Sequence, residues 1–232
     1  MIPKWKKWLS YLFELHVEST SSEYNPHIYV SIRKGRYQLS TANAIYSYGD
    51  LYTNFSNTFD VFDWDKFDAK DVLLLGLGLG SIPFMLEQKY RQKNHYTAVE
   101  IDEEVIDLAY RYVLSDLESS VEMIAADAAI AVHQFQPSSY DLICVDVFED
   151  DEVPPAFEST VFLEQVKSLL KPNGVLLFNR LAATDSDCTK SEAFFKTIFH
   201  KIFPDACLLG VEGNYMLVSP AIAIGEVPAN FN

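Results

Sequence analysis

Asp71-Val-Leu-Leu-Leu-Gly76-Leu-Gly78-Leu-Gly80-Ser81 is the stretch that decides the fold of this chain: an apolar strand runs into a turn of alternating glycines that opens a helix. Glycine suits such a turn because the backbone bends sharply there, and because a ligand can lie against it without a Cβ in the way. A dinucleotide-binding turn would place its third glycine where this chain has Ser81. The spacing therefore favours a nucleoside without a pyrophosphate over NAD, and a purely structural strand–helix corner stays open.

Strands and helices alternate along the chain on both sides of this turn. The strands are expected at 72–75, 96–99, 121–125, 141–145 and 175–178, and the helices at 82–91, 103–113, 128–135, 158–170 and 191–203. This alternation predicts an α/β fold with right-handed crossovers and a mostly parallel sheet covered on both faces. The last two strands, 207–211 and 215–219, form a hairpin with no helix between them. A parallel sheet that ends in an antiparallel hairpin is typical of the Rossmann-like methyltransferase fold.

The first 65 residues follow a different pattern. Two strands are expected at 28–32 and 37–41, around a turn that contains Gly35, which is a β-hairpin signature. We therefore expect two parts: an N-terminal helix and β-hairpin region at 1–65, and a Rossmann-like nucleoside-binding catalytic domain at 66–232.

Several aromatic residues recur at helical spacing and are expected to pack in the core. The residues are Trp5, Trp8, Phe194, Phe195 and Phe199. Near the N-terminus, the helical spacing of Trp5, Trp8, Leu9 and Leu12 also predicts a short packing helix.

Composition limits the function classes. The chain has 232 residues, of which 49% are hydrophobic and 22% charged, so a folded core is expected. The formal net charge is -15 and only 18 residues are Lys or Arg, which argues against nucleic-acid binding because phosphates need basic partners. The acidity serves solubility, or it attracts a cation such as a sulfonium nucleoside or a polyamine.

The three cysteines, Cys144, Cys188 and Cys207, form neither a disulfide framework nor a zinc-binding spacing, so a reducing cytoplasm is expected. None of the five histidines belongs to a metal or triad pattern, so no metal is expected. No stretch approaches the ~20 apolar residues of a membrane span.

Carboxylates follow three consecutive predicted strands. Glu100 lies 20 residues after Gly80, a distance at which an acid at the next strand tip reaches ribose hydroxyls. The alternative for Glu100 is a favourable charge near a helix N-terminus, a role that Asp102 fills better. Asp127 either accepts a hydrogen bond from an adenine amino group or caps the short helix behind it. Asp146 ends the fourth strand, where an open α/β sheet places its ligands.

Five segments together resemble the spermidine/spermine synthases, the aminopropyltransferases that share the methyltransferase fold. They are VLLLGLGLGS from Val72, AVEIDEEVI from Ala98, ADA from Ala126, YDLICVD from Tyr140 and LLKPNGVLLFN from Leu169. The resemblance covers roughly residues 28–220. It implies that Gly76, Gly78, Gly80, Glu100 and Asp127 bind the nucleoside.

The resemblance also implies a reacting site, and there the chain departs from the family. The family's catalytic loop, DSSDP or similar, corresponds to Asp146-Val-Phe-Glu149-Asp, which implies catalytic roles for Asp146 and Glu149. The family's YHE segment keeps its tyrosine as Tyr52, a substrate contact, and Asn43 stands where the family has a ligand-binding Gln. The Asp of the family's GGGDGG turn is replaced by Leu79. Taken together, the residues expected to bind the nucleoside match the family, whereas those expected to bind the polyamine largely differ from it.

Three functions remain open at this point. The resemblance implies a transferase that moves an aminopropyl group from decarboxylated S-adenosylmethionine to an amine. A methyltransferase that uses S-adenosylmethionine on an unknown acceptor would employ the same displacement at a sulfonium carbon. A non-catalytic nucleoside-binding protein is the third. The expected partner is a small cationic substrate, either a polyamine or a methyl acceptor, and a homodimer stays open.

Overall fold

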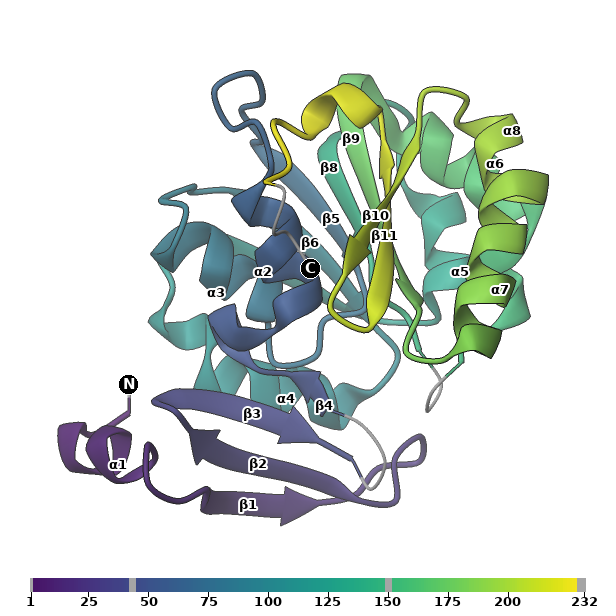
Figure 1. The fold of residues 1–232 in the computed structure, drawn as a ribbon. Helices are drawn as coiled ribbons and strands as arrows, with labels where there is room; N and C mark the ends of the chain where they lie inside the picture. Colours follow the sequence, from purple (N-terminus) through teal and green to yellow (C-terminus); the bar gives the residue numbers. More distant parts are fainter. Residues whose placement is uncertain (1, 42–44, 149–151, 229–232) are drawn as a thin grey trace.

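Two β-sheets organise the protein (Figure 1). The structure is a computed structural model that describes residues 2–41, 45–148 and 152–228. A small antiparallel sheet is built from N-terminal residues, and a large sheet is built from residue 71 onward. Along the described ranges, no helix is both long enough and apolar enough to cross a membrane.

The small sheet has four strands in the order β1-β2-β3-β4. Their bounds are Leu15–Thr20 (β1), Ile28–Arg33 (β2), Arg36–Ser40 (β3) and Ile45–Ser47 (β4). The predicted hairpin is confirmed as β2 and β3, but the two flanking strands were not predicted. In β1, a register shift between His16 and Glu18 interrupts the alternation of inward and outward side chains, and β4 has only three residues. Neither strand therefore shows a clear alternation of apolar and polar residues in the sequence.

The large sheet has seven strands in the order β10-β11-β9-β8-β5-β6-β7. Their bounds are Asp71–Leu75 (β5), His95–Glu100 (β6), Ser120–Ala125 (β7), Tyr140–Val145 (β8), Leu170–Leu181 (β9), Cys207–Val211 (β10) and Asn214–Ser219 (β11). Strands β5 to β9 pair in parallel, and β11 is antiparallel to both β9 and β10. The predicted fold class, a mostly parallel sheet that ends in an antiparallel hairpin, is confirmed.

Helices cover both faces of the large sheet, and two separate apolar clusters result. One face carries α2 (Thr53–Asp60), α3 (Ser81–Gln88) and α4 (Glu103–Tyr112). The other carries α5 (Ala128–Ala131), α6 (Thr160–Leu169) and α7 (Asp185–Phe194), which continues through a π-helical segment, Phe195–Phe199, into α8 (His200–Ile202). Short 3-10 turns span Gly49–Leu51, Leu114–Asp116, Val132–Gln134, Pro155–Glu158 and Ala221–Ala223. The boundary near residue 65 stays a prediction.

Helix α7 begins earlier than the expected 191. Thr184 accepts a hydrogen bond from the backbone N–H of Asp187, and the Asp187 carboxylate accepts one from the backbone of Thr184. This reciprocal capping box starts a polar first turn. Because that turn lacks apolar residues, hydrophobic spacing did not indicate it.

The small sheet attaches to the large domain through a third apolar cluster. Ile28, Val30 and Leu39 of the small sheet pack there with Val105 and Leu108 of α4, and with Leu79 of the glycine turn. The turn is therefore covered by the N-terminal region.

Helix α1 (Lys4–Leu9) contradicts one expectation. Trp5 and Trp8 are 64% and 68% exposed, so they are not core residues, whereas Phe194 and Phe199 are buried as expected. Polar contacts hold the segment instead: the backbone N–H groups of Lys34 and Gly35 donate to the carbonyl and the hydroxyl of Ser10, each at 2.8 Å. Helical spacing alone did not show which side of so short a helix would meet the protein.

Gly76→Ala should destabilise the protein strongly. Gly76 has a φ of +92°, and an added Cβ would lie 2.2 Å from the backbone carbonyl oxygen of Asp146. We expect the free energy of unfolding in urea to fall by at least about 2 kcal/mol, because a left-handed conformation and a backbone overlap combine.

Gly210→Ala is the control, since its Cβ would meet its nearest neighbour, the ring of Tyr215, only at 4.0 Å. Equal unfolding free energies for the two variants would contradict the packing argument.

Candidate active site

A cavity of about 640 Å³ lies at the carboxyl ends of the parallel strands. Strand order reverses between β5 and β8, and an open α/β sheet binds its ligands at such a switch. Loops after β5, β6, β7 and β8 line the cavity together with parts of the small sheet. Its lining includes Tyr24, Asn25, Ile45, Tyr46, Tyr52, Asn54, Gly76, Gly78, Glu100, Asp127, Asp146, Val147, Phe148, Asn179 and Asn214.

The three glycines of the turn meet different neighbours. Gly76 and Gly78 line the cavity, and Gly78 lies so close to β4 that a Cβ would approach the carbonyl oxygen of Tyr46 to 3.0 Å. Gly80 packs against Leu114, where an added Cβ would lie at 2.5 Å. Contacts within the protein therefore already require small residues here, and a ligand role for Gly80 remains a prediction that the cavity lining does not support.

Two further residues of the turn tie it to the small sheet. The Leu79 side chain is buried in the apolar cluster under that sheet, so it packs where the family's acid would stand in sequence. The Ser81 hydroxyl hydrogen-bonds the Ser47 hydroxyl at 2.6 Å and accepts from the backbone N–H of Tyr48 at 2.9 Å. Sequence analysis assigned Ser81 no role.

The Glu100 carboxylate holds the glycine turn in place. One oxygen accepts from the backbone N–H groups of Leu77 at 3.0 Å and Gly78 at 3.4 Å, and the other from Ile101 at 3.0 Å and Asp102 at 3.3 Å. Burial raises the pKa of Glu100 despite these donors. Ribose hydroxyls would have to share the acceptor positions of this carboxylate, so ribose binding by Glu100 stays a prediction.

Two other acids cap helices. Asp102 accepts from the backbone N–H of Glu104 at 3.1 Å and so begins α4, which confirms its expected capping role. Asp127 accepts from Ala129 at 2.8 Å and begins α5, while it also lines the cavity. Capping by Asp127 is thus present, and its adenine contact remains a prediction.

Asp146 stands at the centre of a hydrogen-bond chain. Asn179 donates from Nδ2 to Oδ1 of Asp146 at 2.8 Å, and Tyr52 donates to the same oxygen at 3.3 Å. Asn214 donates in turn to Oδ1 of Asn179 at 3.0 Å. Both hydrogen bonds that described side chains donate to Asp146 end on Oδ1, and none of them uses Oδ2.

The surroundings of Asp146 raise the pKa of its carboxyl group toward neutral pH. The pKa of Asp146 is raised from 3.8 to about 6: burial is the main cause, the hydrogen bonds from Asn179 and Tyr52 act against it, and the nearby Glu100 charge adds to it. Burial and the Asp146 carboxylate raise the pKa of Tyr52 well above its ordinary value, so the phenol stays a donor. A carboxyl group poised near neutrality suits a general base.

The cavity is acidic. Glu100, Asp127 and Asp146 line it, and no Lys or Arg occurs among its described lining residues. Such a field favours a cation. A sulfonium or ammonium group therefore fits the residues present, whereas a free carboxylate would meet no basic side chain there.

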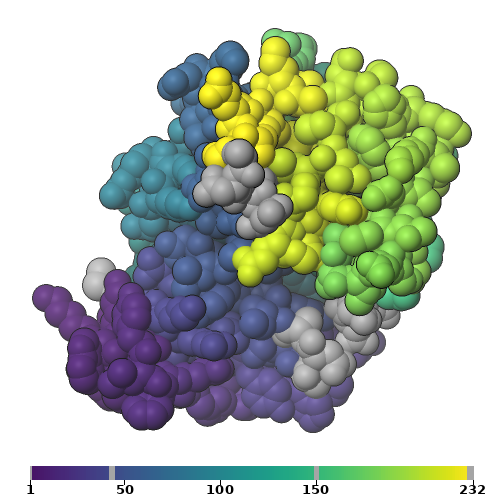
Figure 2. Space-filling view, in the orientation of Figure 1, coloured from purple at the N-terminus to yellow at the C-terminus, as the bar shows by residue number. Residues whose placement is uncertain are grey.

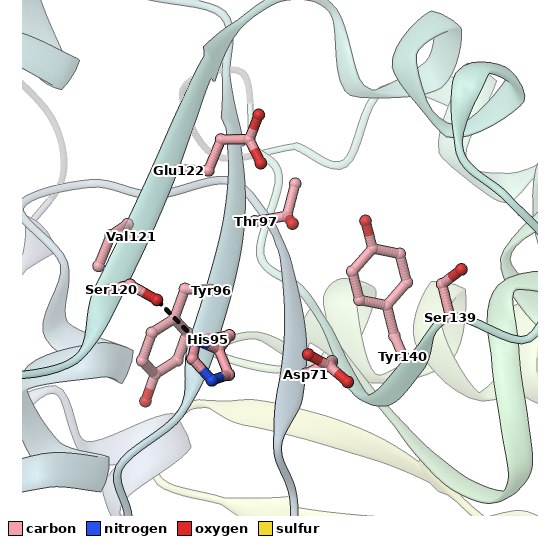
Figure 3. A pocket seen from close by; sticks show the side chains of 9 residues that line it. All are labelled: Asp71, His95, Tyr96, Thr97, Ser120, Val121, Glu122, Ser139 and Tyr140. Atoms are coloured by element: carbon pink, nitrogen blue, oxygen red, sulfur yellow. Dashed lines mark hydrogen bonds between the residues drawn. The ribbon is translucent and has the colours of Figure 1, made fainter.

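A second hollow, of about 620 Å³, lies at the opposite ends of the strands and is open to solvent (Figure 3). Asp71, His95 and Glu122 contribute to it, and the His95 ring bonds the Ser120 hydroxyl at 2.8 Å. It lies away from the strand switch, so the candidate site is the first cavity.

The spermine/spermidine synthase domain family matches residues 54–213, from α2 to the turn between β10 and β11. The chain belongs to this family.

Relatives named for an activity fall into two groups. A probable polyamine aminopropyl transferase of Bifidobacterium longum is 33% identical over 131 residues, which cover 56% of this chain and 28% of that protein. The human eEF1A lysine and N-terminal methyltransferase is 32% identical over 119 residues, covering 47% of this chain and 17% of that protein. The chain thus spans well under half the length of these relatives.

Solved structures of synthases share the fold of this spermine/spermidine synthase family member. A probable spermidine synthase from Corynebacterium glutamicum superposes with a TM-score of 0.72 at 19% identity, covering 88% of this chain and 79% of that one. A spermidine synthase in complex with the transition-state analogue AdoDATO gives 0.69 at 17% identity, with coverage of 90% and 76%.

Not every expected site residue can be placed in this family member. Asn43 and Glu149 lie outside the described residues. Tyr52 and Asp146 are brought together, whereas Asn179 and Asn214 were missed. Asn179 had one signal, since it is a polar residue at the end of an apolar strand. Within the described ranges, no group of three potential metal ligands is found.

Asp146→Asn should stabilise the protein in a pH-dependent way. The folded-state pKa of Asp146 is raised from 3.8 to about 6, so its ionisation costs stability as the pH rises through this window. The advantage of the amide in unfolding free energy should grow by about 2 kcal/mol between pH 4 and pH 7.5, as measured by urea unfolding. A difference that stays constant with pH would contradict the proposed environment.

Glu100→Gln should weaken both the turn and ligand binding. In the variant, an amide NH₂ group replaces one carboxylate oxygen and faces backbone N–H groups that need an acceptor. We therefore expect the free energy of unfolding to fall by about 1–3 kcal/mol. Affinity for methylthioadenosine, measured by calorimetry, should fall roughly ten- to a hundredfold. The exposed Glu122→Gln on β7 serves as the control. If Glu100→Gln loses stability but keeps affinity, Glu100 has a structural role alone.

Proposed function

We propose that this chain transfers an aminopropyl group from decarboxylated S-adenosylmethionine to a small amine. The observation that carries the proposal is the enclosed Asp146 carboxyl, oriented by Tyr52 and Asn179 in an acidic cavity at the strand switch. Membership of the spermine/spermidine synthase family supports the same reaction class.

The nucleoside half of the donor would lie against the glycine turn. Gly76 and Gly78 offer a surface without side chains, and Glu100 and Asp127 supply acceptors for ribose and adenine. The sulfonium charge is favoured by the three cavity carboxylates. The decarboxylated donor fits better than S-adenosylmethionine, because the described lining has no basic side chain for a carboxylate.

The reaction needs a neutral amine. An alkylamine with a pKa near ~10 is about one part in a thousand neutral at pH 7, which costs roughly 4 kcal/mol. Asp146 would accept the ammonium proton and hold the nitrogen in place. The nitrogen lone pair then attacks the propyl carbon next to sulfur, and the carbon–sulfur bond breaks to release methylthioadenosine. Alignment of nitrogen, carbon and sulfur supplies much of the rate.

The asparagine chain would keep the Asp146 carboxyl in its working orientation. Asn179 and Tyr52 both donate to Oδ1, and no described side chain bonds the other oxygen, which the incoming amine would contact. Asn214 fixes the amide of Asn179, since it donates to Oδ1 and thereby leaves Nδ2 to face Asp146. Both asparagines are thus proposed as positioning residues.

A methyltransferase is the second candidate. The human relative named as a lysine and N-terminal methyltransferase favours it, whereas Leu79 does not decide between the two, because either donor carries the amino group that the family's turn acid would hold. The same cavity would then hold S-adenosylmethionine and a methyl acceptor. In a third, non-catalytic function, Val147 and Phe148, which line the cavity, would occupy a former active site. A cytoplasmic location is proposed with all three, because the cysteines are free.

Donor and acceptor assays separate these functions. Each sulfonium donor is incubated with putrescine, spermidine or small methyl acceptors, and methylthioadenosine or S-adenosylhomocysteine is detected by mass spectrometry. We expect methylthioadenosine from the decarboxylated donor and an amine. Asp146→Asn should lower turnover by about 100-fold or more, as for loss of a general base, while methylthioadenosine still raises the melting temperature.

Formation of S-adenosylhomocysteine in place of methylthioadenosine would establish the methyltransferase. If methylthioadenosine raises the melting temperature but no donor–acceptor pair gives a product, the non-catalytic function is favoured. A melting shift with NAD and none with adenosyl sulfur compounds would overturn the nucleoside site itself.

A further inference from the structure

The guanidinium group of Arg180 is buried beneath helix α7, near the carboxyl end of β9. It forms an ion pair with the carboxylate of Glu158, its central carbon lies 4.4 Å from the centre of the Phe194 ring, and its Nε donates to the Ser191 hydroxyl at 3.4 Å. Helix α7 itself lies on the outer surface of the molecule, in green at the right of Figure 2. Arg180 is therefore a charged group inside the protein that has three different partners.

The ion-pair partner of Arg180 belongs to the segment that connects β8 to α6. We call residues 152–158 the wall segment, because three of its side chains, those of Pro154, Ala156 and Phe157, line the candidate active-site cavity. Within the segment, the backbone N–H of Phe157 donates to the Pro154 carbonyl at 3.0 Å, which closes a single 3-10 turn. A turn this short has little stability of its own, so its place in the cavity wall depends on contacts with other elements.

Two ion pairs join the wall segment to β9 and α7. In the first, the side chain of Arg180 is 6% exposed and that of Glu158 is 34% exposed. In the second, Glu152 and Lys190 lie 3.4 Å apart, and their side chains are 74% and 64% exposed. The exposed pair contributes little, because water competes for both charges. Loss of Glu158, in contrast, would leave the Arg180 charge without compensation inside the protein, so this pair is the stronger link.

The packing around Arg180 would also suit an apolar side chain. Phe178 precedes it by two residues on the same face of β9, is fully buried, and packs against the ring of Phe194 with 5.8 Å between the ring centres. A buried ion pair adds little net stability compared with well-packed apolar residues, because both charges lose their water. What the guanidinium adds is direction, since its planar group of N–H donors fixes the orientation of the carboxylate that it binds.

Neighbouring residues of β9 therefore reach two parts of the same cavity. Successive side chains of a strand point to opposite faces, so Asn179 donates to Asp146 while Arg180 holds the wall segment. We propose that Arg180 is a positioning residue, which through Glu158 sets where the wall segment lies and so controls the affinity of the cavity for an adenosyl ligand. This inference rests on the proposed function, because it takes the cavity to hold the adenosyl part of the donor.

Hydrogen exchange of the ligand-free protein tests whether Arg180 holds the wall segment. Arg180→Met removes the charge and keeps much of the side-chain length. Exchange at the backbone N–H of Phe157, followed by mass spectrometry of a peptide that covers the wall segment, should become about tenfold faster, because the segment loses its buried link. Lys190→Met is the matched control: it removes the exposed link to the same segment and should change exchange by less than about twofold.

Calorimetry with methylthioadenosine tests the consequence for binding. Arg180→Met should raise the Kd about tenfold, because wall side chains that are no longer held must be ordered when the ligand binds. Lys190→Met should keep the wild-type Kd. Glu158→Gln should raise the Kd by a similar factor to Arg180→Met, and the double variant by no more than the larger single effect, since both changes remove the same interaction.

Far-UV circular dichroism at the assay temperature shows whether each variant is folded. Arg180→Lys provides a milder test, because it keeps the positive charge but loses the planar donors and the stacking on Phe194. Its Kd for methylthioadenosine should lie between the values of wild type and Arg180→Met. A residue with a stabilising role alone would lower the melting temperature when substituted, but it would leave the Kd of the folded variant unchanged.

Three results would overturn the inference alone: a wild-type Kd in folded Arg180→Met, wild-type exchange of its wall segment, or additive losses of affinity in the double variant. A wild type that does not bind methylthioadenosine would overturn the nucleoside site of the proposed function, and with it the control of affinity by Arg180. The exchange measurement uses no ligand, so it separates these two failures.

Discussion

The close approach of two loops at the strand switch is the constraint on which the rest depends. The backbone N–H of Asp146 donates to the Leu75 carbonyl at 2.8 Å, and the carbonyl of Asp146 lies directly against Gly76. This contact puts the end of β8 beside the start of the glycine turn. The Asp146 carboxyl and the glycine-lined part of the cavity thus become neighbours through backbone packing alone. Only a residue without a Cβ permits such an approach.

Around this contact, acidic side chains both stabilise the fold and line the cavity. Glu100 binds four backbone N–H groups of the turn and the following loop, and Asp127 starts a helix while it lines the cavity. Each acid is therefore fixed by the structure before a ligand arrives. Fixed charges need no reorganisation when a cation binds, which is the physical basis of electrostatic preorganisation.

The features that could be predicted from the sequence are those set by residues close together in the chain. The glycine spacing and the alternation of apolar strands with helices predicted the large sheet, and the strand-end acids predicted three of the carboxylates that line the cavity. Asn179 and Asn214 were missed because their roles depend on which strands become neighbours, and β11 inserts between β10 and β9. The exposure of Trp8 was missed for a related reason: periodicity shows that a helix has an apolar side, but not what covers that side.

The hydrogen-bond chain at Asp146 has a consequence for the order in which the parts of the cavity are completed during synthesis. Its outermost donor, Asn214, belongs to the final hairpin, so a polypeptide that ends before β11 already contains the glycine turn, Glu100 and Asp146. Such an incomplete product would contain the glycine-lined part of the cavity while the Asp146 carboxyl lacked the outermost member of its hydrogen-bond chain. Ribosomal synthesis would therefore complete the glycine turn and its acids first, and the hydrogen-bond chain around Asp146 last.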